Sequence, residues 1–367
     1  MIKKMRLEKK CHININYIRS MVRNKYCKPC ELFLYSCIFG FTEVVEQLLP
    51  EPFTADDVNK GTMLASSGGH ADIVKLLLND SRVDPSAKDN HSFRYASLHG
   101  HFPVVDLLIR DKRVDPSAKE NFALRMASEN GHIEVVKLLL EDKRVDPSDK
   151  ENYALYFASQ NGQYDVVKLL LQDSRIDPTN SNAIKTAAKH GKIEIVKLLL
   201  EDPRVNPSIK NSQPIRMASL SGQLEVVELL LRDPRVNIAA KDNHVIRNAC
   251  ENGHTKLVQM LLKDTKVNPS AKINYALINA SKNKHFEIVK LLLDDPRVDP
   301  SVKDNYVFIQ LSEFGQIDLV RLLLNDPRVD PAANNNKAIR KACENLHLDL
   351  VALLVQDPRV NPPKLIN

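Results

Sequence analysis

Apolar residues recur along this chain in two helical patterns, and the stretch 121–151 contains both of them. Residues 124–127 form a short apolar cluster, and residues 133–140 form a longer apolar stripe at helical spacing. Asn130-Gly131 separates the two, and the turn-rich segment 142–149 follows them. The pattern predicts two short helices joined by a tight turn and followed by a loop.

The glycine between the two predicted helices returns at a nearly constant interval, and we call its position the glycine slot. The slot falls at positions 40, 69, 100, 131, 162, 191, 222, 253, 284, 315 and 346, and nine of these eleven residues are Gly. A period near 30 residues is typical of solenoids, in which each unit buries its apolar face against its neighbours. We therefore predict an all-α solenoid of about eleven helix-turn-helix units of 29–31 residues over residues 31–367. Residues 1–30 then form a leader, and no segment remains for a second globular domain.

The repeated residues resemble those of the ankyrin-repeat family over roughly residues 31–363. The resemblance rests on Ala127-Ser128, on Gly131-His132 and on the apolar run 135–140, which return in register. The family's Thr-Pro-Leu-His motif is replaced by Phe-Ala-Leu-Arg at residues 122–125. This variant is similar to the repeats of ankyrin proteins from giant DNA viruses of amoebae. The units are also shorter than the roughly 33 residues of ankyrin repeats, so we expect short loops or hairpins between them.

The resemblance implies a non-catalytic scaffold or adaptor that binds a partner protein. In the ankyrin family, the two positions before the glycine slot line a concave groove and commonly contact the partner. On this basis the apolar anchor candidates are Phe39, Leu98, Leu220 and Phe314, because apolar residues in desolvated patches dominate interface energies. The polar contact candidates are His99, Glu129, Lys189, Glu251 and Lys282. We expect a monomer.

Charge is concentrated at the start of the chain. Residues 1–30 contain nine Lys or Arg and one Glu, which leaves the rest of the chain nearly neutral although the whole carries +6. Clustered cations favour nucleic acid or an anionic membrane, so a tether that acts through this leader is the alternative function; a solvated, disordered leader is the simpler interpretation. The chain has no signal-peptide core and no run long enough to span a membrane. We expect an intracellular protein in the cytoplasm, with the nucleus as the alternative location.

Catalytic and metal-binding chemistry finds little support. Cys27 and Cys30, with Cys11, His12 and Cys37 nearby, have zinc-like spacing, but Cys30 and Cys37 fill ordinary repeat positions and a second Cys pair is missing. Six histidines follow the glycine slot, namely His70, His101, His132, His254, His285 and His347, at a position that holds Gln in other units. Since Gln cannot act as a general base, we predict that the side chains at this position form structural hydrogen bonds, and we call these residues posts. We expect no enzyme activity, no metal and no cofactor.

Three further repeated positions have structural interpretations. Six residues before the repeated Ala stands Asn or Ser, as at Asn59 and Asn121, and we predict that these residues cap the first helices. Asp-x-Arg in the loops predicts turns with exposed ion pairs. A row of cations lies two residues before the repeated Ala, and we expect most of them to bond the neighbouring unit. The row comprises Arg94, Arg125, Lys185, Arg216, Arg247 and Arg340.

The two ends of the predicted solenoid are unusually apolar. The first helix is rich in large apolar residues over 32–39, and the last unit carries Leu353, Leu354 and Val355 with no unit after it. Terminal units of a solenoid normally present a polar outer face. Either the adjoining chain ends cover these faces or a partner does.

Overall fold

The computed structural model describes residues 28–179 and 182–360. Residues 1–27 of the basic leader and the tail from residue 361 lie outside the described residues. The described part contains 22 helices, α3 to α24, in eleven pairs, and it contains no strand. This confirms the predicted all-α solenoid of about eleven units, and of the two expected connections, short loops or hairpins, the described residues form loops. In each pair the odd-numbered helix precedes the glycine slot and is called the first helix; the even-numbered helix is called the second.

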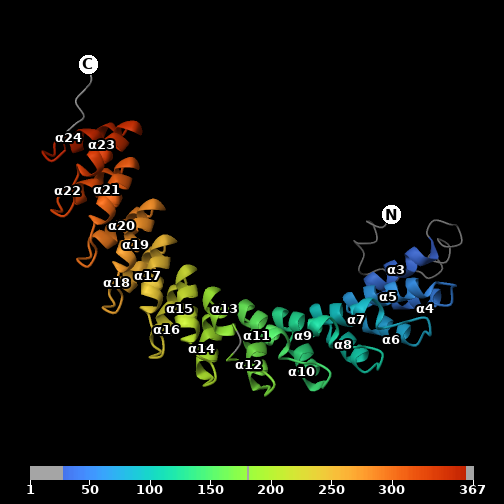
Figure 1. The fold of residues 1–367 in the computed structure, drawn as a ribbon. Helices are drawn as coiled ribbons and strands as arrows, with labels where there is room; N and C mark the ends of the chain where they lie inside the picture. Colours follow the sequence, from blue (N-terminus) through green and yellow to red (C-terminus); the bar gives the residue numbers. More distant parts are fainter. Residues whose placement is uncertain (1–27, 180–181, 361–367) are drawn as a thin grey trace. The chain divides into compact units, whose positions relative to one another are not determined.

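Residues Met1–Ser181 form one compact unit, the N-terminal unit. Its helices are α3 (Pro29–Phe39), α4 (Thr42–Leu48), α5 (Ala55–Ser67), α6 (Ala71–Leu78), α7 (Ala87–Leu98), α8 (Phe102–Ile109), α9 (Ala118–Asn130), α10 (Ile133–Glu141), α11 (Asp149–Asn161) and α12 (Tyr164–Gln172). Consecutive first helices pack side by side, and so do consecutive second helices. Within this unit the helices therefore form two layers (Figure 1).

Residues Asn182–Asn367 form the second compact unit, the C-terminal unit. Its helices are α13 (Ala183–Lys189), α14 (Ile193–Glu201), α15 (Ile209–Leu220), α16 (Leu224–Leu231), α17 (Ala240–Glu251), α18 (Thr255–Leu262), α19 (Ala271–Lys282), α20 (Phe286–Leu293), α21 (Val302–Glu313), α22 (Ile317–Leu324), α23 (Ala333–Glu344) and α24 (Leu348–Val355). The first helices again pack consecutively from α13 to α23, and each packs against the second helix of its own pair.

The core follows the apolar pattern of the repeat. In α10, Val135, Val136 and Leu139 are buried, and in α9 the small residues Ala127 and Ser128 are fully buried. Small residues on the first helices let neighbouring backbones approach closely, while the branched residues of the second helices fill the space between pairs. The same alternation along each unit gives one continuous apolar strip.

Three consecutive residues with positive φ stand at the start of most first helices, and we call them the left-handed turn. Lys119, Glu120 and Asn121 have φ of 54°, 59° and 52°. L-residues avoid this region, and Asn tolerates it better than most. The turn recurs at residues 88–90, 119–121, 150–152, 210–212, 241–243, 272–274, 303–305 and 334–336.

The left-handed turn overturns the predicted role of the repeated Asn. A capping side chain requires extended backbone at the cap position, whereas Asn90 has a φ of 59°. Its Oδ1 instead accepts a hydrogen bond of 2.8 Å from the amide of Asp115, in the next repeat. Asn59 is also no cap, because it lies inside α5, where Thr54 accepts from the amide of Asp57. The prediction was wrong because the contact partner lies 25 residues away.

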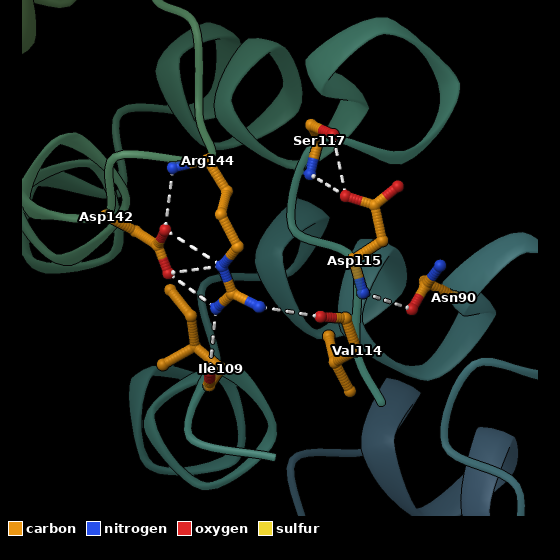
Figure 2. A network of polar contacts seen from close by, with 7 residues as sticks. All are labelled: Asn90, Ile109, Val114, Asp115, Ser117, Asp142 and Arg144. Carbon is orange, nitrogen blue, oxygen red and sulfur yellow. Dashed lines mark hydrogen bonds and ion pairs between the residues drawn. The ribbon is translucent and has the colours of Figure 1, made fainter. Parts of the chain in front are cut away.

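The Asp-x-Arg segments form the predicted turns and also join consecutive repeats. In Figure 2 the Arg144 guanidinium is held by both carboxylate oxygens of Asp142, and its Nη1 and Nη2 donate to the carbonyls of Val114 and Ile109 at 2.9 and 3.0 Å. We call this arrangement the arginine clamp. It holds the pKa of Asp142 below its usual range, chiefly through the hydrogen bonds from Arg144. The predicted exposed ion pair is therefore a link between repeats.

Both terminal pairs leave apolar side chains exposed, but of the three residues expected on the outer face of the last unit only Val355 is exposed, at 49%, because Leu354 is fully buried and Leu353 is half-buried. On the first pair, Phe39 is 42% exposed and lies 4.4 Å from the ring of Tyr35, with Phe41 beside them at 6.4 Å from each ring. On the last pair, Leu346 and Leu348 are 78% and 71% exposed. The chain ends that were expected to cover these faces lie outside the described residues.

Candidate interaction surface

The candidate contact residues lie at the C-terminal ends of the first helices, in the two positions before each glycine slot. We call these positions the interaction row. The next repeat fixes the main chain of this row: His132 Nε2 lies 3.0 Å from the carbonyl oxygen of Leu98, and Gln163 Nε2 donates to that of Glu129 at 3.0 Å. Because a carbonyl oxygen only accepts, Nε2 of His132 carries the hydrogen. The same contact joins His70 to Ile38, His101 to Ser67, His254 to Leu220, His285 to Glu251 and His347 to Glu313.

These contacts confirm the predicted hydrogen-bonding posts and explain the glycine slot. Gly100 has a φ of 72°, and a Cβ placed there would lie 2.4 Å from Nδ1 of His132. Both the backbone conformation and the ring that reaches across it therefore require Gly. Burial lowers the pKa of His101 below its ordinary value, which suits a neutral ring that donates one hydrogen bond.

In the N-terminal unit the interaction row contains four of the predicted contact residues. Phe39 is exposed, and its ring lies beside that of Phe41. Phe41 was not among the predicted contact residues, although it is an aromatic residue only two positions after Phe39. Leu98 and Glu129 are half-buried, and His99 is exposed. Helices α7 and α9 pack together, so Leu98, His99 and Glu129 share one surface. Phe39 belongs to α3, which packs on α5.

In the C-terminal unit, Lys189, Leu220, Glu251 and Lys282 end four consecutive first helices. Lys189, Leu220 and Lys282 are exposed, whereas Glu251 is half-buried. The carboxylate of Glu251 accepts from the Tyr275 hydroxyl at 3.4 Å. Consecutive packing of α13, α15, α17 and α19 brings these row positions together.

Phe314 is less accessible than its place in the row suggested. Its ring centroid lies 6.2 Å from that of Phe286, and the Lys284 ammonium lies 4.8 Å from the ring. The residue is therefore half-buried. Of the four apolar anchor candidates, Phe39 and Leu220 are exposed, while Leu98 and Phe314 are partly covered.

The cation row beside the interaction row contacts its own repeat and not its neighbour's main chain. Arg216 donates through Nε to the carbonyl of Asn211 and through Nη2 to that of Lys210, both at 3.0 Å. Arg94, Arg125, Arg247 and Arg340 make the same kind of bond within their own units. The expected bond to the neighbouring unit was wrong because the left-handed turn directs its carbonyls back toward the same helix. Contact with the next unit is through rings, as where Arg247 lies 5.0 Å from the ring of Tyr275.

The cysteines of the described residues do not gather into a metal site. No group of three or more His, Cys, Asp or Glu residues in residues 28–179 and 182–360 could hold a metal ion. Cys30 donates to Asp57 Oδ1 at 3.1 Å, and burial raises the pKa of the Cys37 thiol to about 12. Cys11, His12 and Cys27 lie outside the described residues.

Paired helices, posts across a glycine slot and clamps between repeats define a helical-solenoid protein. A family model for ankyrin repeats (3 copies) matches residues 32–120, 93–182, 174–242, 218–304 and 277–364, so the chain belongs to the ankyrin-repeat family. Ankyrin repeats are in general protein–protein interaction modules. The comparison with curated proteins found no match. Within the described residues, every helix is too short or too polar to cross a lipid bilayer.

Proposed function

We propose that this chain is a non-catalytic scaffold that binds a partner protein through its interaction row. Binding through this row is supported by its combination of a fixed main chain with variable side chains. The posts hold the carbonyls of Leu98, Leu220 and Glu251 in equivalent positions, while the side chains there differ in size and charge. A surface that is rigid before binding loses less conformational entropy when a partner docks.

Affinity would come from the exposed apolar residues of the row. Phe39 is 42% exposed and Leu220 is 36% exposed, and burying such side chains in an interface commonly dominates its energy. Charged neighbours such as Lys189 and Lys282 would surround these anchors and select the partner. We expect the scaffold to work as a monomer inside the cell, and its repeat variant fits an origin among the ankyrin proteins of giant DNA viruses of amoebae.

The test compares partner capture from cell extract by four forms of the protein. These are the full chain, residues 31–367, a row variant with Phe39, Leu98, Leu220 and Phe314 each changed to Ser, and a control variant. The control changes Phe102, Tyr164 and Leu322 to Ser, because these side chains are exposed on second helices, away from the row. Circular dichroism establishes that each form is folded.

We expect the row variant to lose a specific protein partner that the control variant and residues 31–367 both retain. Loss in residues 31–367 alone would instead assign binding to the leader, which is the tether alternative. Equal loss in the row and control variants would also contradict the proposal, because it would show that general surface hydrophobicity retains the partner.

A further inference from the structure

The left-handed turns form a ladder of ion pairs in the N-terminal unit. Lys119 Nζ lies 2.9 Å from Asp89 Oδ2 of the preceding repeat, and Lys150 pairs with Glu120 in the same way. In the C-terminal unit the acidic position of the ladder is occupied by Asn211 in one repeat and by Ile273 in another. In the repeat after each of these two positions, the lysine of the left-handed turn therefore lacks the carboxylate with which Lys119 and Lys150 pair.

Unpaired cations collect on three consecutive first helices of the C-terminal unit. Helices α13 and α15 each carry two Lys or Arg and no acidic residue, whereas every first helix of the N-terminal unit carries at least one Asp or Glu. Because α13 packs on α15 and α15 on α17, their cations share one surface, which we call the basic patch. It consists of Lys185, Lys189, Lys210, Arg216, Lys241 and Arg247, and none of these forms an ion pair within the described part of the chain.

Two members of the basic patch are almost entirely buried without a neutralising carboxylate. Arg216 and Arg247 are 7% and 6% exposed. Nε and Nη2 of Arg247 donate to the carbonyls of Asp242 and Lys241 at 2.9 and 2.8 Å, which orients the guanidinium but leaves its charge. Burial and the nearby Lys210 lower the pKa of Lys185. The patch therefore concentrates positive charge where a bound anion would relieve repulsion.

The two acidic residues of α17 are already engaged. Asp242 lies 3.4 Å from Lys272 Nζ, and Glu251 accepts from the Tyr275 hydroxyl. His244 also lies among these cations, and burial lowers its pKa to about 4, so it is neutral at pH 7. Asp242 thus pairs with a cation outside the patch, and within the described residues Glu251 forms no ion pair with a member of the patch.

We propose that the basic patch binds an extended, acidic segment of the partner protein. This inference rests on the proposed function, because the patch includes Lys189 of the interaction row and adjoins Leu220, which lies one turn beyond Arg216 on the same helix face. Neighbouring helices pack about 8–10 Å apart, and an extended chain rises about 3.3 Å per residue. Acidic residues roughly three apart would thus meet successive repeats, with an apolar side chain between them for Leu220.

The patch suits a peptide better than a nucleic acid. Helices α13, α15 and α17 contain no Phe, Tyr or Trp. Proteins that bind single strands combine a positive groove with aromatic side chains on which the bases stack. Cations beside an exposed aliphatic residue instead match acidic and apolar side chains of a protein segment.

The experiment measures binding of a fluorescent peptide of about ten residues with Glu at every third position, by anisotropy at low salt. The full chain is compared with a patch variant, Lys210→Gln with Lys241→Gln, and a control, Lys119→Gln with Lys150→Gln. All four lysines hold the same position of the left-handed turn, so both variants lose the same charge. A peptide with Gln in place of Glu and an oligothymidine serve as comparison probes.

We expect the Glu peptide to bind, the Gln peptide to bind at least tenfold more weakly, and the patch variant to lose about tenfold in affinity while the control loses less than about twofold. Equal losses in the two variants would overturn the proposal, since net charge alone would then explain binding. Tighter binding of oligothymidine than of the Glu peptide would also overturn it, in favour of a nucleic-acid site. If no Glu peptide binds but the row variant still loses its protein partner, the acidic-segment inference fails and the proposed function stands.

Discussion

The N-terminal and C-terminal units are built from the same repeat, but the N-terminal unit follows the repeat pattern more closely at the glycine slots and the arginine clamps. In the N-terminal unit all five glycine slots hold Gly, and the four clamp positions are Arg82, Arg113, Arg144 and Arg175. In the C-terminal unit Lys284 and Leu346 replace slot glycines, and Lys266 replaces a clamp arginine. The ion-pair ladder is also interrupted there. One unit thus shows the intact pattern and the other shows what each departure changes.

The clearest departure is at Lys284. In an intact slot, Gln163 Nε2 donates to the Glu129 carbonyl, and a Cβ at Gly131 would lie 2.4 Å from Gln163 Oε1. Lys284 carries that Cβ, and Gln316, the post of the next repeat, instead donates to the carbonyl of Phe314 in its own repeat at 3.3 Å. A single side chain in one repeat therefore changes the bond that its neighbour makes, and couplings between repeats are set locally.

Acid should produce the largest effect, because arginine clamps occur in both units. Arg hydrogen bonds lower the pKa of Asp111, Asp142, Asp233 and Asp326 among others. A carboxyl whose pKa is depressed on folding contributes stability above its unfolded pKa of about 4, and that stability is lost as pH falls through the folded pKa. We expect the free energy of unfolding in urea to change little from pH 7 to about 5 and to fall steeply below about 4.

A matched variant separates the clamps from general acid unfolding. Asp142→Asn keeps an oxygen for the amide of Arg144, which donates to Asp142 Oδ1 at 2.9 Å, but removes the titrating group. Its stability should be lower at pH 7 and should depend less steeply on pH. If the variant has the same pH dependence as the unmodified protein, the clamp carboxylates do not govern the acid transition.

Gly100→Ala should be strongly destabilising in the N-terminal unit. It puts a Cβ at a φ of 72° and 2.4 Å from His132 Nδ1, and left-handed strain with overpacking costs about 2–4 kcal/mol. Lys284→Ala is the matched change in the C-terminal unit, where a Cβ is already present, and should cost less than about 1 kcal/mol. Urea unfolding measures both, and hydrogen exchange of α7 and α9 locates the first. Equal costs would show that the slot tolerates a side chain in either unit.

Much of the fold follows from the sequence because it depends on short-range pattern. The helix pairs, the period and the posts all follow from spacings that return in register, as for His132 exchanging with Gln163. The left-handed turn was missed because Lys-Glu-Asn at residues 119–121 has the composition of a helix start. The partner of Asn90 stands 25 residues further on, and no local rule identifies it.

The interaction row was located by resemblance, but its accessibility could not be predicted. Phe314 is covered because Lys284 and Phe286, which lie almost a full repeat earlier, approach its ring. Leu220 has no such cover and remains exposed. Exposure at equivalent positions therefore depends on the residues of the neighbouring repeat, which pattern analysis of a single repeat does not include.

A smaller effect than that of Gly100→Ala should come from exchanging the clamp residues of the two units. Arg144→Lys removes the bonds to Val114 and Ile109, because an ammonium cannot reproduce the planar fork of a guanidinium, and should cost about 1–2 kcal/mol. Lys266→Arg should gain roughly 0.5–1 kcal/mol, since the Lys266 amide already makes the turn hydrogen bond to Asp264 Oδ1 at 2.8 Å. The new bonds would be those of the guanidinium, to the Asp264 carboxylate and to the preceding repeat. Urea unfolding gives both values, and hydrogen exchange of the loop amides before each clamp shows whether the change stays local. If Arg144→Lys leaves stability unchanged, the Asp-x-Arg segments act only as turns; if Lys266→Arg alone has no effect, the C-terminal unit has adapted to its missing clamp.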